Sequence, residues 1–356
     1  MKVLFLQAPE YLERYELSSG VNVMYLNGNY KVSSSDLKQY DLVVSCVNHD
    51  AVANFVIQKS RRNGIPTLML TDGVFDLANS LNNGISNKAG VRPCFDNSAQ
   101  FITSCTNLSD KVSRLSGADS IKYIPKFVFN QKDSKVSKGI DTQYALITTA
   151  NSPYFSSSEY DLLLRLMTKL VDVLIKKKIR IKFRVFDVKL LNALTSKMDD
   201  DSYLVVNEGT FISSLDDVAA CFSTHSSIVI PVVMSDIPLG CFLYRSEPVE
   251  PIAGWYLIND LDFSDIVDDM LNPDPDRLAF QKACIKDFKN KSIVDIHAEL
   301  VEIPVTDDLT YDKLLKLLHS PFNINLQYFF YKFYLKIKGN KIIRKIRLLL
   351  VNGTGN

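Results

Sequence analysis

Short apolar runs alternate with a helical pattern through the first half of the chain. Four such runs occupy residues 3–6, 21–26, 42–46 and 65–70, each of a length typical of a buried strand. Residues 51–62 place Val52, Phe55 and Val56 on one helical face, and Gly64 follows where a glycine commonly ends a helix. With two more strands at 100–104 and 121–124 and a helix near 109–116, the pattern predicts a mainly parallel sheet covered by helices.

The same alternation restarts after a polar stretch at 130–141, NQKDSKVSKGID, which we interpret as a linker between two domains. Beyond it, strands are expected at 144–148, 179–186, 202–206, 218–223 and 238–244. Helices are expected from a cap at Ser156, Ser157 or Ser158 to about residue 177, and at 228–234, 263–271 and 277–288. The pattern predicts an α/β protein of two tandem Rossmann-like domains, residues 1–135 and 142–300, with a C-terminal extension at 301–356.

Length supports this division, because 356 residues exceed what one hydrophobic core usually serves. The six cysteines are scattered without a C-x-x-C pair, which favours reduced thiols and a cytoplasmic protein. The opening MKVLFLQAPE is too short for a secretion signal and is better explained as a buried strand. No apolar run approaches the roughly 20 residues that span a bilayer.

The C-terminal end differs from the rest of the chain in charge. The formal net charge is +1, yet residues 328–356 hold seven Lys and Arg side chains, several aromatic rings and no acid. Such a basic, aromatic segment suits an anionic membrane surface, and we expect it to bind the inner face of the cytoplasmic membrane. The alternative is a closing helix that packs on the first domain. Nothing else in the chain supports a nucleic-acid partner.

Several cofactor motifs are missing from the sequence. No G-x-G-x-x-G opens a helix and no G-x-x-x-x-G-K-[ST] occurs, which argues against a dinucleotide site and a P-loop. None of the four histidines has a second His or a Cys at metal-binding spacing. We therefore expect no cofactor and no metal site.

The strongest local signal is the run at 221–227, CFSTHSS, in which an apolar strand ends in small hydroxyls and one histidine before an apolar helix. Hydroxyls and free N–H groups at a helix start favour an anion. We predict that Ser223, Thr224, Ser226 and Ser227 bind a phosphate, and that His225 faces a cleft between the domains and donates to a phosphate oxygen. The alternative is that Ser223 and Thr224 only cap the helix.

Other strand ends also carry polar residues. Asp72 follows the strand at 65–70 in a Thr-Asp-Gly step, where its carboxylate can act as a general base or form a turn. Thr149 and Asn151 follow the strand at 144–148 and can contact a phosphate or a sugar, or belong to an ordinary loop. For Glu208 a turn is favoured over a ribose contact. Because ligands bind beyond the carboxyl ends of parallel strands, we expect such residues to face one cleft.

Three stretches carry a family resemblance: LTDGVFDLANS at 70–80, STHSS with IPLG at 223–240, and residues 255–280. Together they resemble bacterial glycosyltransferases of the GT-B architecture, and more narrowly those that build capsules and lipopolysaccharide O-antigens. The chain departs from that pattern at Thr71, where an acid or Gln is expected. It also lacks the His-Pro of the second-domain motif and the Glu of the donor helix, which leaves the nucleotide open.

The resemblance implies a transferase that moves a sugar from a nucleotide-sugar donor to a lipid-linked or oligosaccharide acceptor of a growing surface polysaccharide. Asp72 then takes the proton of the acceptor hydroxyl, and His225 with the hydroxyl cluster, Thr149 and Asn151 holds the donor. Inversion at the anomeric carbon without a metal is expected. Three alternatives stay open: a polyol-phosphate transferase, a UDP-GlcNAc 2-epimerase-like enzyme, and a non-catalytic polysaccharide-assembly protein. The epimerase needs more acids and histidines in the cleft than the sequence indicates.

Overall fold

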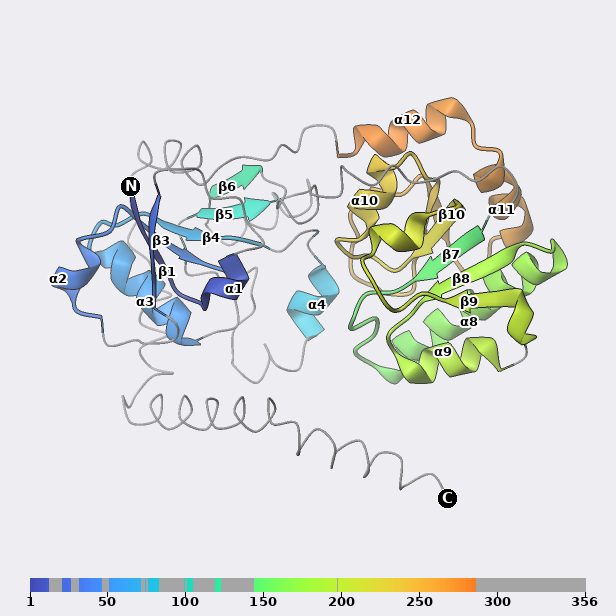
Figure 1. The fold of residues 1–356 in the computed structure, drawn as a ribbon, viewed down its shortest axis with the longest axis horizontal. Helices are drawn as coiled ribbons and strands as arrows, with labels where there is room; N and C mark the ends of the chain where they lie inside the picture. Colours follow the sequence, from blue (N-terminus) through green and yellow to red (C-terminus); the bar gives the residue numbers. More distant parts are fainter. Residues whose placement is uncertain are drawn as a thin grey trace, which may run out of the picture.

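The protein folds into two lobes, each built on a six-stranded sheet (Figure 1). The computed structural model describes residues 1–12, 21–26, 32–46, 51–71, 74, 76–82, 99, 101–104, 119–122, 144–196 and 198–285. The predicted helix near 109–116, the linker at 130–141 and the extension at 301–356 lie outside the described residues. The α/β class with two Rossmann-like sheets is confirmed, and the domain boundaries stay a prediction.

The first sheet has the strand order β2-β1-β3-β4-β5-β6, and all its pairs are parallel. Its strands are β1 (Lys2–Phe5), β2 (Asn22–Tyr25), β3 (Leu42–Ser45), β4 (Thr67–Met69), β5 (Phe101–Ser104) and β6 (Asp119–Lys122). The helices of this part are α1 (Pro9–Leu12), α2 (Ser34–Leu37), α3 (Ala51–Arg62) and α4 (Leu77–Asn82). The six strands and α3 were predicted, whereas the short helices α1, α2 and α4 were not.

The second sheet has the order β12-β11-β10-β7-β8-β9 and is also parallel throughout. Its strands are β7 (Tyr144–Thr148), β8 (Arg180–Arg184), β9 (Tyr203–Val205), β10 (Val218–Ser223), β11 (Leu239–Phe242) and β12 (Trp255–Leu257). Its α-helices are α8 (Ser157–Lys176), α9 (Val188–Thr195), α10 (Val229–Met234), α11 (Phe263–Leu271) and α12 (Pro275–Ala283), with 3-10 turns at Asp200–Ser202 and Ile212–Leu215. The strand β12 and the helix α9 were not predicted.

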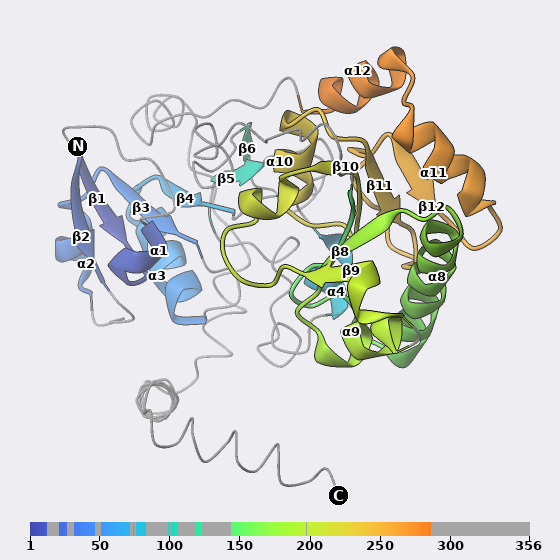
Figure 2. The ribbon, with the colours of Figure 1, turned by 45° about the vertical axis from the view of Figure 1, so that its right-hand side comes forward.

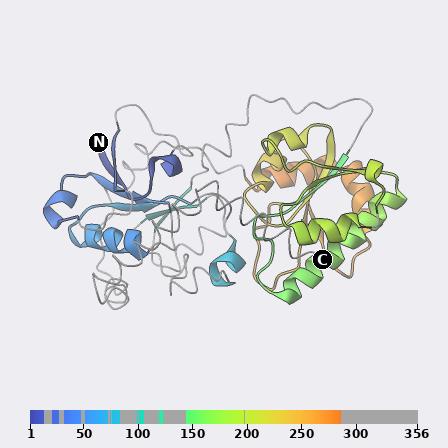
Figure 3. The ribbon, with the colours of Figure 1, turned by 60° about the horizontal axis from the view of Figure 1, so that its bottom comes forward.

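Helices cover both faces of the second sheet (Figure 3). Successive side chains of a strand point to opposite faces of the sheet, so alternate residues pack in the apolar clusters on its two sides. In β7, Ala145 and Ile147 pack with residues of α8, α9 and α11, whereas Leu146 packs with residues of α10. Burial on both faces explains why these strands are continuously apolar and why the sequence predicted them well.

Two local signals behave as the sequence predicted. Gly64 has a φ of 73°, a left-handed conformation that glycine adopts without the steric penalty of a side chain, and it follows the end of α3. Ser156 is the N-cap of α8, because its hydroxyl accepts a hydrogen bond from the Glu159 amide at 3.2 Å.

The buried Gln281 of α12 fastens this helix to the edge of the sheet. Its Oε1 accepts from the amides of Leu239 at 2.9 Å and Gly254 at 3.2 Å, and its Nε2 donates to the Ile237 carbonyl at 2.9 Å. The residue is 1% exposed. Three backbone groups at the starts of β11 and β12 therefore depend on one side chain.

Replacing Gln281 with Leu should lower the free energy of unfolding by at least about 2 kcal/mol, because buried backbone groups lose their partners. The control is Lys282→Ala on the same helix, which removes an exposed ion pair with Asp236 and should change stability by about 0–1 kcal/mol. Chemical denaturation measures both. Equal losses in the two variants would contradict the role assigned to Gln281.

Candidate functional site

The strand order of the second sheet reverses between β7 and β10, which are hydrogen-bonded neighbours. In open parallel sheets, ligands bind beyond the carboxyl ends of the strands at such a reversal. The residues that follow these two strands are Thr149 and Ala150 after β7, and Thr224 and His225 after β10. The structure thus brings together two stretches that the sequence analysis had selected separately.

Thr224 joins the two strand ends. Its Oγ1 accepts a hydrogen bond from the Ala150 amide at 2.7 Å, and its own amide donates to the Thr148 carbonyl at 3.3 Å. A hydroxyl that accepts in this way keeps its proton to donate elsewhere. Thr149 lies beside it, and its buried Oγ1 has no hydrogen-bond partner among the described residues.

His225 is buried, with 6% of its surface exposed, which differs from the expectation that it faces an open cleft. Its Nε2 accepts a hydrogen bond from the Glu250 amide at 3.0 Å. Burial lowers the pKa of the imidazole to about 4, although the nearby Asp76 acts in the opposite direction. The ring is therefore neutral at pH 7, and with Nε2 as acceptor its proton resides on Nδ1. This leaves His225 as an uncharged hydrogen-bond donor.

The serines of the cluster differ in their surroundings. Ser223 is fully buried and donates to the Thr224 carbonyl at 2.7 Å, so its proton is used within the loop. The Ser226 hydroxyl accepts from the Ile228 amide at 3.4 Å. The helix α10 begins after Ile228, which has no side-chain cap. Capping by Ser223 or Thr224, the alternative left open above, is thus not what these residues do.

The segment after β4 crosses to the second domain. The Val74 amide donates to the Ser227 hydroxyl at 3.1 Å, and the Val74 side chain packs in an apolar cluster formed otherwise by second-domain residues such as Val229. Further on, Asn82 donates to Glu247 at 3.0 Å. In all three ribbon views, α4 accordingly lies beside the second domain (Figure 2).

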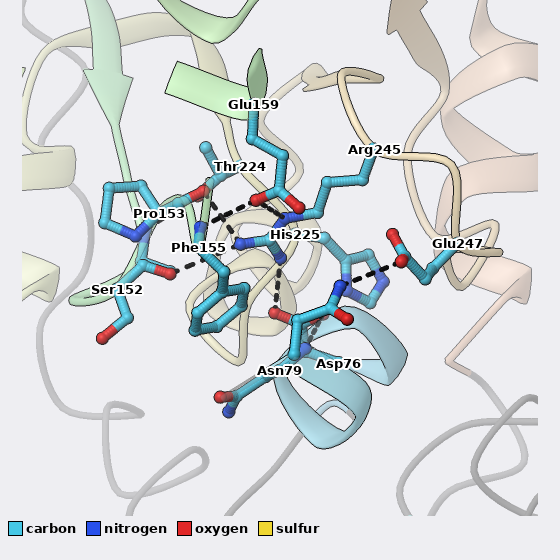
Figure 4. A network of polar contacts seen from close by, with 12 residues as sticks. Asp76, Asn79, Ser152, Pro153, Phe155, Glu159, Thr224, His225, Arg245 and Glu247 are labelled. Atoms are coloured by element: carbon cyan, nitrogen blue, oxygen red, sulfur yellow. Dashed lines mark hydrogen bonds and ion pairs between the residues drawn. The ribbon is translucent and has the colours of Figure 1, made fainter. Parts of the chain in front are cut away.

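An arginine that the sequence analysis did not select occupies the centre of this contact (Figure 4). The Arg245 side chain is 5% exposed, and its Nη1 donates to Asp76 at 2.7 Å. Its Nη2 donates to the Pro153 carbonyl at 2.9 Å, and its Nε lies 3.4 Å from a Glu159 oxygen. The ring of Phe155 lies 4.9 Å from the guanidinium carbon. The only sequence signal for Arg245 was its position just after β11.

Arg245 keeps its positive charge although its side chain is buried. Burial alone lowers the pKa of Arg245, but Tyr244, Asp76 and Glu159 together raise it above its ordinary value. The guanidinium therefore stays protonated and needs its two acids, because an unpaired buried charge is strongly unfavourable.

Two other selected residues lie at the margin of the site, and one lies outside the described part. Asn151 is exposed after β7. Glu208 is exposed in the loop after β9. In this loop, the carbonyl oxygens of Val206 and Gly209 accept hydrogen bonds from the buried Arg184 at 2.6 and 3.1 Å. Asp72 belongs to the residues that the structure does not describe.

Within the described ranges, no three His, Cys, Asp or Glu side chains gather in an arrangement that could hold a metal ion. In the same part of the chain, no helix is long and apolar enough to cross a membrane.

Comparison with known proteins finds solved structures with a similar fold. No protein-family model matches the sequence, and no curated protein does. Among solved structures, the chain is similar to a UDP-GlcNAc 2-epimerase from Neisseria meningitidis bound to UDP-GlcNAc, with a TM-score of 0.53 and 10% identity over 85% of this chain and 99% of that one. It is also similar to S. aureus MnaA bound to UDP, with a TM-score of 0.51 and 11% identity over 86% and 99% of the chains.

A third similar structure is the glycotransferase of kitacinnamycin, with a TM-score of 0.50 and 10% identity over 86% of this chain and 99% of that one. These neighbours have the GT-B type of fold, two Rossmann-like domains in tandem, and this chain shares it.

The burial of His225 generates a test in solution. In the unfolded chain the imidazole takes up a proton near its ordinary pKa of 6.5, and in the folded chain only near 4. The contribution of the neutral His225 to the free energy of unfolding is therefore fully present above about pH 6.5 and is lost as the pH falls from 6.5 to 4. We expect wild type to lose about 3 kcal/mol more over this range than His225→Gln, since one pKa unit corresponds to about 1.4 kcal/mol.

Gln is chosen because its Oε1 can accept from the Glu250 amide as Nε2 does. Urea denaturation at a series of pH values measures the difference. Parallel losses in the two proteins would show that His225 is not buried in its neutral form.

Proposed function

We propose that the protein is a glycosyltransferase that takes a sugar from a nucleotide-sugar donor and transfers it to a growing bacterial surface polysaccharide. The observation that carries this proposal is the set of neutral hydrogen-bond donors at the carboxyl ends of β7 and β10. They are the hydroxyls of Thr149 and Thr224 and the Nδ1–H of His225.

These groups suit the phosphates of a donor. A leaving nucleoside diphosphate gains negative charge as the bond to the sugar breaks, and preorganised donors stabilise that charge where water is excluded. The residues described at this point offer hydroxyl, imidazole and amide donors, and the nearby cation Arg245 is already paired with Asp76. In this proposal Ser226, Ser227 and the exposed Asn151 complete the donor site.

The chemistry is a single displacement that requires no metal. The acceptor hydroxyl attacks the anomeric carbon, the bond to the phosphate oxygen breaks, and the configuration inverts. Asp72 takes the proton of the attacking hydroxyl. Val74, two residues after Asp72 in the chain, hydrogen-bonds Ser227 of the donor domain, which supports a proposal in which Asp72 acts close to the donor.

The fold supports a nucleotide-sugar as the substrate, since similar structures were obtained with UDP-GlcNAc and with UDP. UDP is accordingly the first nucleotide to test. The chemistry of the site alone does not distinguish UDP from CMP, CDP or GDP.

An epimerase acting on UDP-GlcNAc is the second candidate, and one observation favours it. The sequence analysis weighed against it because acids were expected to be too few. In the structure the carboxylates of Asp76, Glu159 and Glu247 lie around His225 and Arg245 (Figure 4). Asp76, Glu247 and Glu159 already have partners on the protein, in Arg245, Asn82 and the Phe155 amide, which is why we prefer transfer.

Ligand binding and product analysis test the proposal together. We expect one of UDP, CMP, CDP and GDP to raise the melting temperature, since a ligand at 100 times its Kd adds about 2.7 kcal/mol of stability. Incubation with the matching nucleotide-sugar and no acceptor should release nucleotide and free sugar slowly. An isomer of the donor, seen by NMR, would identify an epimerase instead, and the absence of binding by all four nucleotides would refute both.

The Asp72→Asn variant tests the mechanism. Asn keeps the size and the turn-forming capacity of Asp but takes no proton, so single-turnover transfer with saturating donor should fall by about 10²–10⁴-fold. Donor affinity should stay the same, because the donor binds the second domain. The control is Asp260→Asn in an exposed loop. Near-normal turnover in a stably folded Asp72→Asn protein would remove Asp72 from the mechanism.

The proposal also assigns residues 328–356 to the inner membrane surface, where a lipid-linked acceptor resides. Deleting them should abolish sedimentation with vesicles rich in anionic lipid, and added salt should weaken binding of the full chain, because salt screens the Lys and Arg charges. Equal sedimentation of the two proteins would contradict a membrane role. Loss of solubility on deletion would instead support the closing helix.

A further inference from the structure

Two acids and one arginine from distant parts of the chain meet at the contact between the domains (Figure 4). Asp76 belongs to the first domain, and Arg245 follows β11 of the second. Their side chains are 19% and 5% exposed, so the ion pair is largely shielded from water. Removing one partner of such a shielded ion pair is destabilising, because the other charge is left buried without compensation.

Arg245 also holds the loop after β7. Its Nη2 donates to the carbonyls of Ser152 at 3.4 Å and Pro153 at 2.9 Å, and its Nε faces Glu159 in the first turn of α8. One guanidinium thus connects three elements: the start of α4, the loop that follows Thr149, and the start of α8. Release of Asp76 leaves Arg245 with Glu159 as partner, so the arginine does not become an unpaired charge when α4 leaves.

Among the described residues, Val74 and Asn82 also contact the second domain. Val74 contributes one buried side chain and one hydrogen bond to Ser227, and Asn82 donates to one oxygen of Glu247. The second oxygen of Glu247 is buried without a hydrogen-bond partner among the described residues. A buried acceptor with no donor destabilises the docked arrangement. Among these contacts, the Asp76–Arg245 pair is the one that joins two opposite charges.

We propose that Val74 and residues 76–82 form a latch between the domains, and that the Asp76–Arg245 ion pair is its lock. The latch contacts the second domain at Ser227, Arg245 and Glu247. Arg245 is then a positioning residue: it contacts no substrate, and it sets the distance between the two domains and the order of the loop after β7. Opening exchanges Asp76 for water, with Glu159 left on the arginine, and it also breaks the contacts of Val74 and Asn82.

The structure offers a substitution that isolates the lock. Asp76 has a second role, because its Oδ1 accepts from the Asn79 amide at 3.2 Å in the first turn of α4. Asn caps a helix about as well as Asp. Asp76→Asn therefore keeps the cap of α4 but removes the charge and the Oδ2 acceptor that Arg245 uses, whereas Asp76→Ala removes the cap as well.

Hydrogen exchange of the ligand-free, full-length chain tests the latch. In Asp76→Asn we expect the amides of residues 76–82 to exchange at least tenfold faster than in wild type, with α8 unchanged. Arg245→Gln should give the same acceleration, and the double variant should add little to either single one, because both remove the same interaction. The matched control is Asp268→Asn, which removes an ion pair with Lys177 inside the second domain.

Wild-type exchange at residues 76–82 in Asp76→Asn would overturn the proposal, and so would equal acceleration in Asp268→Asn. If Arg245→Gln fails to fold, Asp76→Asn and its Ala counterpart decide alone: acceleration in Ala but not in Asn would mean that Asp76 serves only as a cap. Because no nucleotide is used, failure of the latch leaves the proposed function untouched, and absence of nucleotide binding leaves the latch untouched.

Discussion

In the second sheet the chain adds β8 and β9 on one side of β7, and β10 to β12 on the other. The loops after β7 and β10 therefore diverge from neighbouring strands, and the groups between them are not covered by a crossover of their own domain. Thr149, Thr224 and His225 lie at this point. The segment around α4 from the first domain contacts the same loop, since the Val74 amide donates to Ser227, two residues after His225.

Electrostatics at the contact follows from the same arrangement. The side chain of Arg245 is buried at this contact, and Asp76 and Glu159 compensate its charge. The arginine in turn acts with burial to keep His225 neutral. Asp76 and Glu159 thus stabilise the charge of Arg245, whereas Asp76 and Arg245 act in opposite directions on the neutral imidazole of His225. A change in one of them is transmitted to the others over a few ångströms.

The same groups limit the chemistry available to the site. An imidazole with a pKa of about 4 is a poor general base at pH 7 but remains a hydrogen-bond donor through Nδ1. The sequence analysis assigned His225 to phosphate contact, and the neutral tautomer is compatible with that role. It is less compatible with a role as a proton carrier. The distinction could not be drawn from the sequence, because the same histidine on an open surface titrates near 6.5.

The sequence by itself determined the elements and their succession. Strands buried on both faces are continuously apolar, and signals such as Ser156 and Gly64 act on neighbouring residues only, so both could be predicted from local order. The helix α4 was missed, because helices of one or two turns owe their stability to tertiary contacts. The three-residue strand β12 was also missed. Only the folded chain decided that Asp76 meets Arg245 and that His225 is buried, since partners 169 residues apart leave no local pattern.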